Sequence, residues 1–159
     1  MKIKIEEVKK GDINSIVKLQ MRLADYHKEI DPRYYRSGKE SEKQRRERLK
    51  GYFSKKRKNT KILVAKVNGK ITGFLKGAIH KLHLYCREER MGEISQLYID
   101  EKFRRKRIGK LLFEELLKWF KKRKIKFIEV QVDSKNKIAI VAYKKYGFFE
   151  FQKRMKLDL

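Results

Sequence analysis

The dipeptide Asn68-Gly69 constrains the fold of this chain more than any other feature. It separates two apolar runs, Ile62–Val67 and Ile71–Ile79. An Asn-Gly pair between two such runs is the strongest short-range signal for a β-hairpin. The sequence therefore predicts two adjacent antiparallel strands near the middle of the chain.

Apolar periodicity predicts the elements around this hairpin. Before it we expect a strand over Ile3–Val8, a helix that Gly11-Asp12 caps and Pro32 follows, and a second helix within Lys39–Lys56. After it, Lys81–Arg90 is a connector. The elements predicted beyond the connector are a strand over Glu93–Ile99, a helix over Lys106–Lys122, a strand over Ile125–Val132, a helix over Asn136–Tyr146 ended by Gly147, and one or two strands within Phe148–Leu157.

The resulting order, β-α-α-β-β-β-α-β-α-β, places an antiparallel hairpin half before a strand–helix–strand crossover. Such an order predicts an α/β (α+β) fold with a mixed, mostly antiparallel sheet flanked by helices. A chain of 159 residues fits one domain, and we find no linker or repeat, so we expect a single domain over residues 1–159.

Composition narrows the class of protein. The chain has no Cys/His cluster with zinc spacing and a single cysteine, so we expect no metal site and a reducing, cytoplasmic location. We see no signal peptide and no apolar run long enough to cross a bilayer, which predicts a soluble protein without membrane attachment. The net charge of +25 is spread along the chain and interleaved with Glu, as on a thermophile-like solvated surface, although it also makes nucleic acid a candidate partner.

The stretch from Gln96 to Lys110 carries the clearest chemical signal. It reads as a strand, a turn and a helix that opens with a basic run and one glycine. Unpaired N–H groups at a helix start bind phosphate oxygens, and Arg and Lys side chains around the turn add to this. Gly109 would let a bulky ligand approach the backbone. A solvated basic helix end is the alternative, whereas Walker and GxGxxG phosphate loops are absent.

This stretch resembles the acetyl-CoA-binding signature of the GNAT superfamily of N-acetyltransferases, Q/R-x-x-G-x-G/A. In this sequence the signature reads Arg104-Arg105-Lys106-Arg107-Ile108-Gly109, with Arg107 where the family usually has its first glycine. Downstream, the run from Asn136 to Phe148 is similar to the family's N-x-x-A-x-x-x-Y-x-x-x-G-F element at matching spacing. The resemblance covers essentially the whole chain and is weakest over residues 31–58.

The resemblance implies that acetyl-CoA is the co-substrate and that its acetyl group passes directly to an amine in a ternary complex. It implies that Tyr143 is the general acid, with Tyr146 as the fallback, and that Glu93 is a candidate base, with Ser95 and Tyr98 as lesser ones. Tyr143 could instead be an apolar-face residue, and Glu93 an exposed strand-end carboxylate. The other residues expected to contact acetyl-CoA are Leu97, Tyr98, Ile99, Arg104, Arg105, Lys106, Arg107, Ile108, Gly109, Lys110 and Asn136, the last of which is also a good helix N-cap.

The acceptor amine is left open between a small amine or polyamine and a protein N-terminus or lysine. The residues expected to read it are aromatic and acidic groups in the first helical region: Tyr26, His27, Glu29, Asp31, Tyr34 and Tyr35. The alternative function is a non-catalytic, nucleic-acid-associated protein on the same fold. Few exposed aromatics accompany the basic stretches Lys39–Arg48 and Lys118–Lys126, which disfavours a base-stacking surface. A homodimer is a further expectation, because many family members pair.

Overall fold

A five-stranded sheet forms the centre of the computed structural model, which describes residues 2–36, 40–54, 58–84 and 86–159. The strands lie in chain order across the sheet. They are β1 (Ile3–Glu7), β2 (Thr60–Val67), β3 (Lys70–Lys81), β4 (Arg90–Ile99) and β5 (Ile128–Val130). The first three pairings are antiparallel and the β4–β5 pairing is parallel, so the predicted mixed, mostly antiparallel sheet is confirmed.

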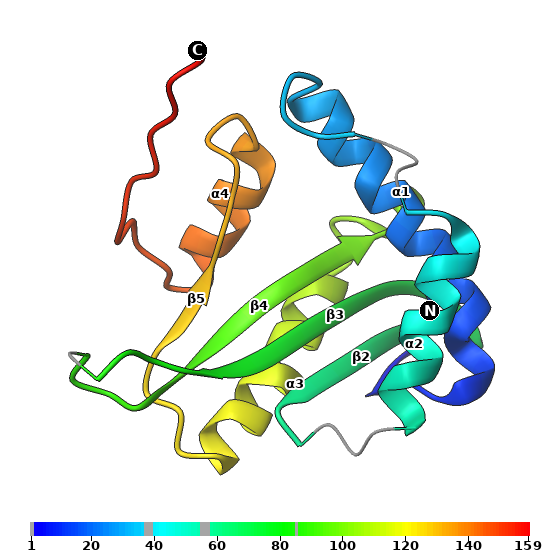
Figure 1. The fold of residues 1–159 in the computed structure, drawn as a ribbon. Helices are drawn as coiled ribbons and strands as arrows, with labels where there is room; N and C mark the ends of the chain where they lie inside the picture. The colour runs from blue at the N-terminus through cyan, green and yellow to red at the C-terminus, as the bar shows by residue number, and fades with distance from the viewer. Residues whose placement is uncertain (1, 37–39, 55–57, 85) are drawn as a thin grey trace.

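Four helices flank the sheet, two on each face (Figure 1). They are α1 (Ile13–Ile30), α2 (Glu42–Ser54), α3 (Ile108–Lys122) and α4 (Lys137–Lys145), with short 3-10 turns η1 (Lys10–Asp12) and η2 (Glu101–Phe103). One core lies between the sheet and α1 and α2, around Ile16, Val64 and Phe74. The other lies between the sheet and α3, around Leu75 and Leu112. Alternation along each strand sends neighbouring side chains into these two cores in turn.

The β2–β3 hairpin forms as predicted. Asn68 and Gly69 both have positive φ angles, 48° and 82°, which is the requirement of the tight type I′ turn. Val67 pairs with Lys70 across that turn, so the register of both strands is fixed from this end.

The strands β4 and β5 pair only over three residues, Gly92–Ile94 with Ile128–Val130, and then separate (Figure 1). The β3–β4 register shifts at the same point: Ile94 lies opposite Gly77 and Gln96 opposite Lys76, so Ser95 is the extra residue of a bulge. The second half of β4 therefore has no strand partner on its β5 side.

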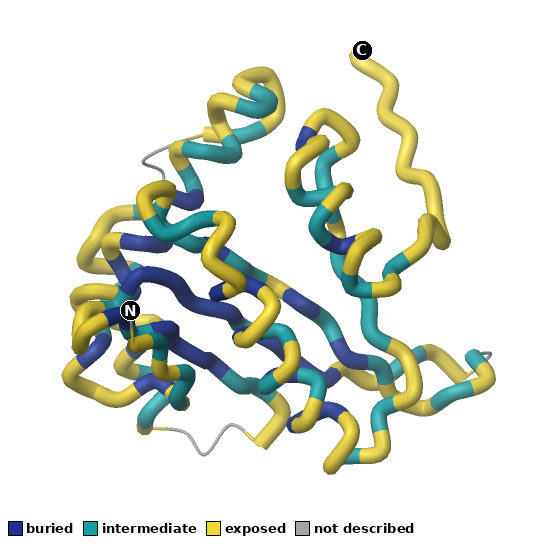
Figure 2. Tube along the Cα trace, turned by 180° about the vertical axis from the view of Figure 1, so that it is seen from behind, coloured by how far each residue is buried: buried dark blue, intermediate teal, exposed yellow. Residues whose placement is uncertain are grey.

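Two predicted strands differ from the structure. The last strand or strands within Phe148–Leu157 do not form: this segment has no ladder partner, and its apolar side chains Phe149 and Phe151 stay 80% and 78% exposed (Figure 2). Alternating apolar residues specify the faces of a strand but not the neighbour that must bind its N–H groups. The strand expected over Ile125–Val132 is confined to Ile128–Val130, because the separation from β4 removes its partner beyond Val130.

The cap of the first helix also differs. Asp12 precedes α1, but its side chain makes no cap bond there. Its carboxylate accepts from the Lys9 backbone N–H at 2.8 Å and pairs with Lys66 at 3.1 Å. The second helix lies within the expected stretch, whose ends, Lys39 and residues 55–56, fall outside the described residues. Across the described ranges, no helix is long and apolar enough to span a membrane, and no group of three metal-binding side chains occurs.

Candidate active site

The junction between β4 and α3 is held rigidly by Asp100. The Asp100 backbone N–H donates to the Thr72 carbonyl at 2.8 Å, and its carboxylate accepts from the Lys102 N–H at 3.3 Å. Arg22 of α1 pairs with the same carboxylate at 2.6 Å. The turn after β4 is thus tied to both β3 and α1.

The loop before α3 adopts a backbone that side-chain-bearing residues rarely take. Arg105 and Arg107 both have positive φ, 59° and 61°. Only Gly adopts this region without cost, which explains why the family has a glycine where this chain has Arg107. The sequence departs from the signature, but the loop keeps the left-handed shape.

Three backbone N–H groups at the start of α3 have no acceptor within the helix. The first helical bond runs from the Leu111 N–H to the Arg107 carbonyl at 3.1 Å, so the N–H groups of Ile108, Gly109 and Lys110 precede it. Together with the positive end of the helix dipole, such groups form an anion site.

The basic side chains of the loop divide into two groups. Arg104 turns back toward α1: its Nε donates to the Ile99 carbonyl at 3.1 Å, and its guanidinium lies 5.3 Å from the Tyr26 ring and 5.8 Å from the Tyr98 ring. Lys106 lies over Phe103 at 5.1 Å. By contrast, Arg105 and Arg107 are exposed, and within the part of the chain described neither makes an ion pair.

Gly109 is required by packing within the protein itself. A Cβ at this position would lie 3.0 Å from the Tyr146 hydroxyl and 3.1 Å from Cδ1 of Ile99. We expected the missing side chain of Gly109 to leave room for a ligand. In the structure the side chain of Tyr146 lies in that space. The same contact brings the Tyr146 hydroxyl close to the unpaired N–H groups of α3.

Tyr143 lies beside Tyr146 in an aromatic cluster between α3 and α4. Its ring packs edge-on against Phe148 at 5.5 Å and near Tyr146 at 6.4 Å, while Tyr146 stacks on Phe113 of α3. Tyr143 is 9% exposed, and this burial raises the pKa of its phenol far above the usual value. The phenol stays protonated at neutral pH, which a proton donor requires, while its burial makes it a weaker acid than an exposed tyrosine.

Asn136 caps α4, as one of its two expected roles requires. Its Oδ1 accepts from the Ala139 N–H at 3.1 Å and from the Tyr26 hydroxyl at 3.4 Å. Through the Asn136 side chain these two bonds connect the start of α4 with Tyr26, near the end of α1. Gly147, with φ 94°, ends α4 as predicted, and the Phe148 N–H donates back to the Tyr143 carbonyl.

Glu93 faces the α1 side of the sheet, one position before the β4 bulge begins. A Cβ on its neighbour Gly92 would meet Phe120 of α3, so alternation sends Glu93 to the opposite face. His80 Nε2 lies 2.5 Å from the Glu93 carboxylate. In register, Glu93 is directly opposite Glu129 of β5.

Sequence reasoning missed Glu129 and the hydrogen bond from Gln20 Nε2 to Gln96 Oε1, which is 3.0 Å long. The alternation of Ile128 and Val130 indicates that Glu129 faces away from their core, but the strand register that brings it to Glu93 is not visible in the sequence. Gln20 is buried on α1, and its own Oε1 has no partner among the described residues.

The expected acceptor residues are only partly brought together. Tyr26, His27, Asp31 and Tyr35 meet the β5–α4 loop: Lys135 pairs with Asp31 at 2.9 Å, and the His27 ring stacks on Tyr35 at 5.0 Å. Burial lowers the pKa of His27 despite the nearby Asp133 carboxylate. Glu29 lies instead at a separate hollow with Asp25, and Tyr34 lies under Lys156 of the C-terminal segment.

Comparisons with known proteins agree with this geometry. The profile of the acetyltransferase (GNAT) family matches residues 23–148. An uncharacterized N-acetyltransferase of Methanocaldococcus jannaschii is 29% identical over 148 residues; these are 92% of this chain, which spans about 60% of that relative's length.

Two solved structures share the fold. A mutant of a Bacillus halodurans protein matches with a TM-score of 0.83 and 22% identity, over 98% of this chain and 99% of that one. A predicted acetyltransferase from Clostridium acetobutylicum, determined with acetyl-CoA, matches with a TM-score of 0.75 and 19% identity, over 99% of this chain and 96% of that one. The chain thus combines an α/β fold, in which β4 and β5 separate, with a match to an established sequence profile. We call the basic loop Arg104–Arg107, which leads into α3, the anion loop. The chain belongs to the GNAT acetyltransferase family.

Proposed function

We propose that this protein transfers the acetyl group of acetyl-CoA to a primary amine. The observation that carries the proposal is the β4–α3 junction, where three unpaired N–H groups, two exposed arginines and the Tyr146 hydroxyl lie near an unpaired strand edge, with the ring of Tyr143 next to that of Tyr146. A thioester attached to a diphosphate needs these features: an anion site, a strand edge for its amide arm and an acid near its sulfur.

The N–H groups of Ile108, Gly109 and Lys110 bind the diphosphate in this proposal, and Arg105 and Arg107 add charge-assisted bonds. The β5-facing edge of Leu97–Ile99 bonds the pantetheine arm as an added strand would. Arg104 and Lys106 act indirectly, because Arg104 fixes the loop to β4 and α1 and Lys106 packs on Phe103.

In the chemical step the neutral amine nitrogen attacks the thioester carbonyl carbon. A C–N bond forms, the C–S bond breaks, and a backbone N–H near Leu97 or Tyr98 stabilises the oxygen that becomes negative. As the amide forms, the attacking nitrogen loses one proton to water, Tyr143 donates its proton to the leaving sulfur, and a proton from water restores the Tyr143 phenol. Glu93, held by His80, accepts a proton from the incoming ammonium, directly or through water.

The acceptor approaches from the α1 side of the sheet. Carboxylates and aromatic rings gather there on an otherwise strongly cationic protein, namely Glu93, Glu129, Asp31, Asp133 and the rings of Tyr26 and Tyr35. These groups suit a cationic amine. Both a small amine and the N-terminus or lysine of a protein meet that description.

Thiol release from acetyl-CoA, measured against polyamines, aminoglycosides and peptide N-termini, tests the activity and identifies the acceptor class. Acetyl-CoA affinity is tested separately by calorimetry with the double variant Arg105→Ala/Arg107→Ala, because replacing Gly109 would also disturb Tyr146. We expect a loss of about ten-fold or more, whereas the control double variant Lys18→Gln/Lys43→Gln should bind like the wild type. Equal affinity for all three proteins would refute the phosphate assignment.

A further inference from the structure

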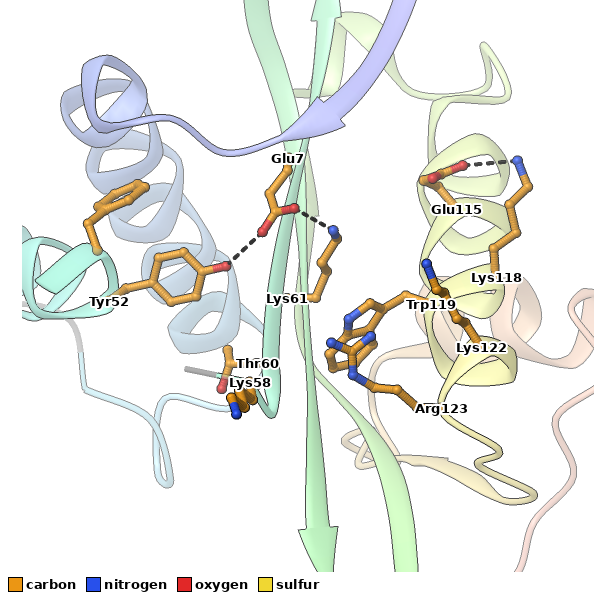
Figure 3. A pocket seen from close by; sticks show the side chains of 11 residues that line it. Glu7, Tyr52, Lys58, Thr60, Lys61, Glu115, Lys118, Trp119, Lys122 and Arg123 are labelled. Carbon is orange, nitrogen blue, oxygen red and sulfur yellow. Dashed lines mark hydrogen bonds and ion pairs between the residues drawn. The ribbon is translucent and has the colours of Figure 1, made fainter. Parts of the chain in front are cut away.

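A second basic surface lies at the opposite end of α3 from the anion loop. There a hollow of about 670 Å³ opens between the end of α2, the start of β2 and the end of α3 (Figure 3). The length of α3, 15 residues, separates it from the loop at Arg107 by about 22 Å. We call it the basic groove; its cationic side chains are Lys58, Lys61, Lys118, Lys122 and Arg123.

The positive charge of the basic groove is not balanced. Two carboxylates line it, and each has one lysine as its partner: Lys61 pairs with Glu7, and Lys118 pairs with Glu115 at 3.0 Å. Lys58, Lys122 and Arg123 have no ion-pair partner within the described ranges. Three uncompensated positive charges therefore surround one hollow.

Helix electrostatics explain only part of this arrangement. Cations near the C-terminus of α3 stabilise its dipole, which is equivalent to about half a charge. Lys58 lies just before β2 and Lys61 within it, however, and both come about sixty residues earlier in the chain than Lys118 and Lys122. The fold brings two separate basic stretches together, where their mutual repulsion opposes folding unless an anion binds.

Trp119 of the basic groove is not available to stack on a base, and the other two aromatic residues that line the groove, Tyr52 and Phe53, pack edge-on against each other with ring centres 5.2 Å apart. Trp119 is 8% exposed, and the guanidinium of Arg123 lies 4.5 Å from the centre of its ring. The Tyr52 hydroxyl points to Glu7, at 3.4 Å. Stacking fixes the planar guanidinium of Arg123 in place, and such a group binds phosphate oxygens in a bidentate manner.

We propose that the basic groove binds the phosphodiester backbone of nucleic acid, independently of base sequence. Backbone binding needs only cations and does not depend on a base-stacking surface. An acidic protein fits less well, because protein interfaces are centred on exposed apolar anchors and here the largest ring, that of Trp119, is buried beneath Arg123.

The test is fluorescence anisotropy of the full chain with a labelled duplex DNA and a labelled single-stranded RNA, at several salt concentrations. The groove variant is Lys58→Gln/Lys122→Gln/Arg123→Gln. The control, Lys18→Gln/Lys43→Gln/Lys153→Gln, removes the same net charge at exposed positions outside the groove. Circular dichroism checks that both variants fold, and acetyl-CoA calorimetry keeps this result separate from the proposed function.

Three phosphate contacts predict a slope of log affinity against log salt of about −2.7 for duplex DNA and about −2.1 for a single strand. The groove variant should bind at least ten-fold more weakly and lose about 0.9 of slope on duplex DNA, or about 0.7 on a single strand, for each cation removed. The control should change affinity less than three-fold. Whichever nucleic acid binds more tightly identifies the natural source of the phosphodiester.

Equal losses in the two variants would overturn the proposal, since net charge alone would then explain binding. Absence of binding to both nucleic acids at 50 mM salt would also overturn it. So would tighter binding of a poly-glutamate peptide than of either nucleic acid, because the partner would then be an acidic protein.

Discussion

Replacing Gly109 by Ala is the most informative single change, since it tests the contact between the anion loop and α4. The new Cβ would lie 3.0 Å from the Tyr146 hydroxyl and 3.1 Å from Ile99 Cδ1, and both neighbours must move by a few tenths of an ångström. Overpacking of this kind costs about 1–3 kcal/mol. Alanine recovers about 0.5–1 kcal/mol relative to glycine in a helix.

The variant should therefore be less stable by about 1 kcal/mol. For a chain of this length, that change lowers the melting temperature by about 2–4 °C. Urea unfolding of four proteins measures it: the wild type, Gly109→Ala, Tyr146→Phe and the double variant. Tyr146→Phe removes the oxygen atom that the new Cβ meets.

In the double variant the overpacking against Tyr146 should disappear while the contact with Ile99 Cδ1 remains, which gives a coupling energy of up to about 1 kcal/mol between positions 109 and 146. An unchanged dependence on urea would show that the denatured state is not responsible. Additive effects, within about 0.3–0.5 kcal/mol, would refute the contact between Tyr146 and the start of α3.

Four further outcomes follow from the structure. Arg107→Gly should raise the free energy of unfolding by up to about 1 kcal/mol in urea melts, because glycine adopts φ 61° without strain; Arg107→Ala serves as the control, and equal stability of the two variants would contradict the argument. Tyr143→Phe should lower kcat at least a hundred-fold in the thiol-release assay with little change in acetyl-CoA affinity, and unchanged turnover would reject Tyr143 as the acid. Glu93→Gln should shift the alkaline rise of the pH–rate profile, and a profile that stays in place would reject Glu93 as the base. Hydrogen bonds, first to Lys4, hold the pKa of Glu6 at about 2 instead of 4.5. The resulting stability is present above pH 4.5 and is lost as the pH falls toward 2, so Glu6→Gln should flatten the acid limb of the stability curve, and an unchanged limb would contradict the assignment.

Local signals in the sequence are sufficient for much of the fold. The Asn68-Gly69 turn fixes β2 and β3, and the apolar stripe that begins at Ile108 predicts α3 to within two residues of its start. These features depend on neighbours only a few positions away, so the sequence expresses them directly.

The features that the sequence did not reveal depend on contacts between distant residues. The register that pairs Glu93 with Glu129, the bulge at Ser95 and the turning of Arg104 toward Tyr26 all depend on how separate elements meet. Alternation in the C-terminal segment likewise predicted a strand without specifying its partner. The basic groove is a further case, because neither of its basic stretches indicates the other.

Nuclear magnetic resonance of the backbone amides during a titration with acetyl-CoA tests the central claim most directly. If the diphosphate binds at the start of α3, the N–H signals of Ile108, Gly109 and Lys110 should shift downfield, and they should move far more than those of Lys122 and Arg123 at the other end of the helix. Saturable binding of acetyl-CoA that leaves the three signals in place would contradict the account.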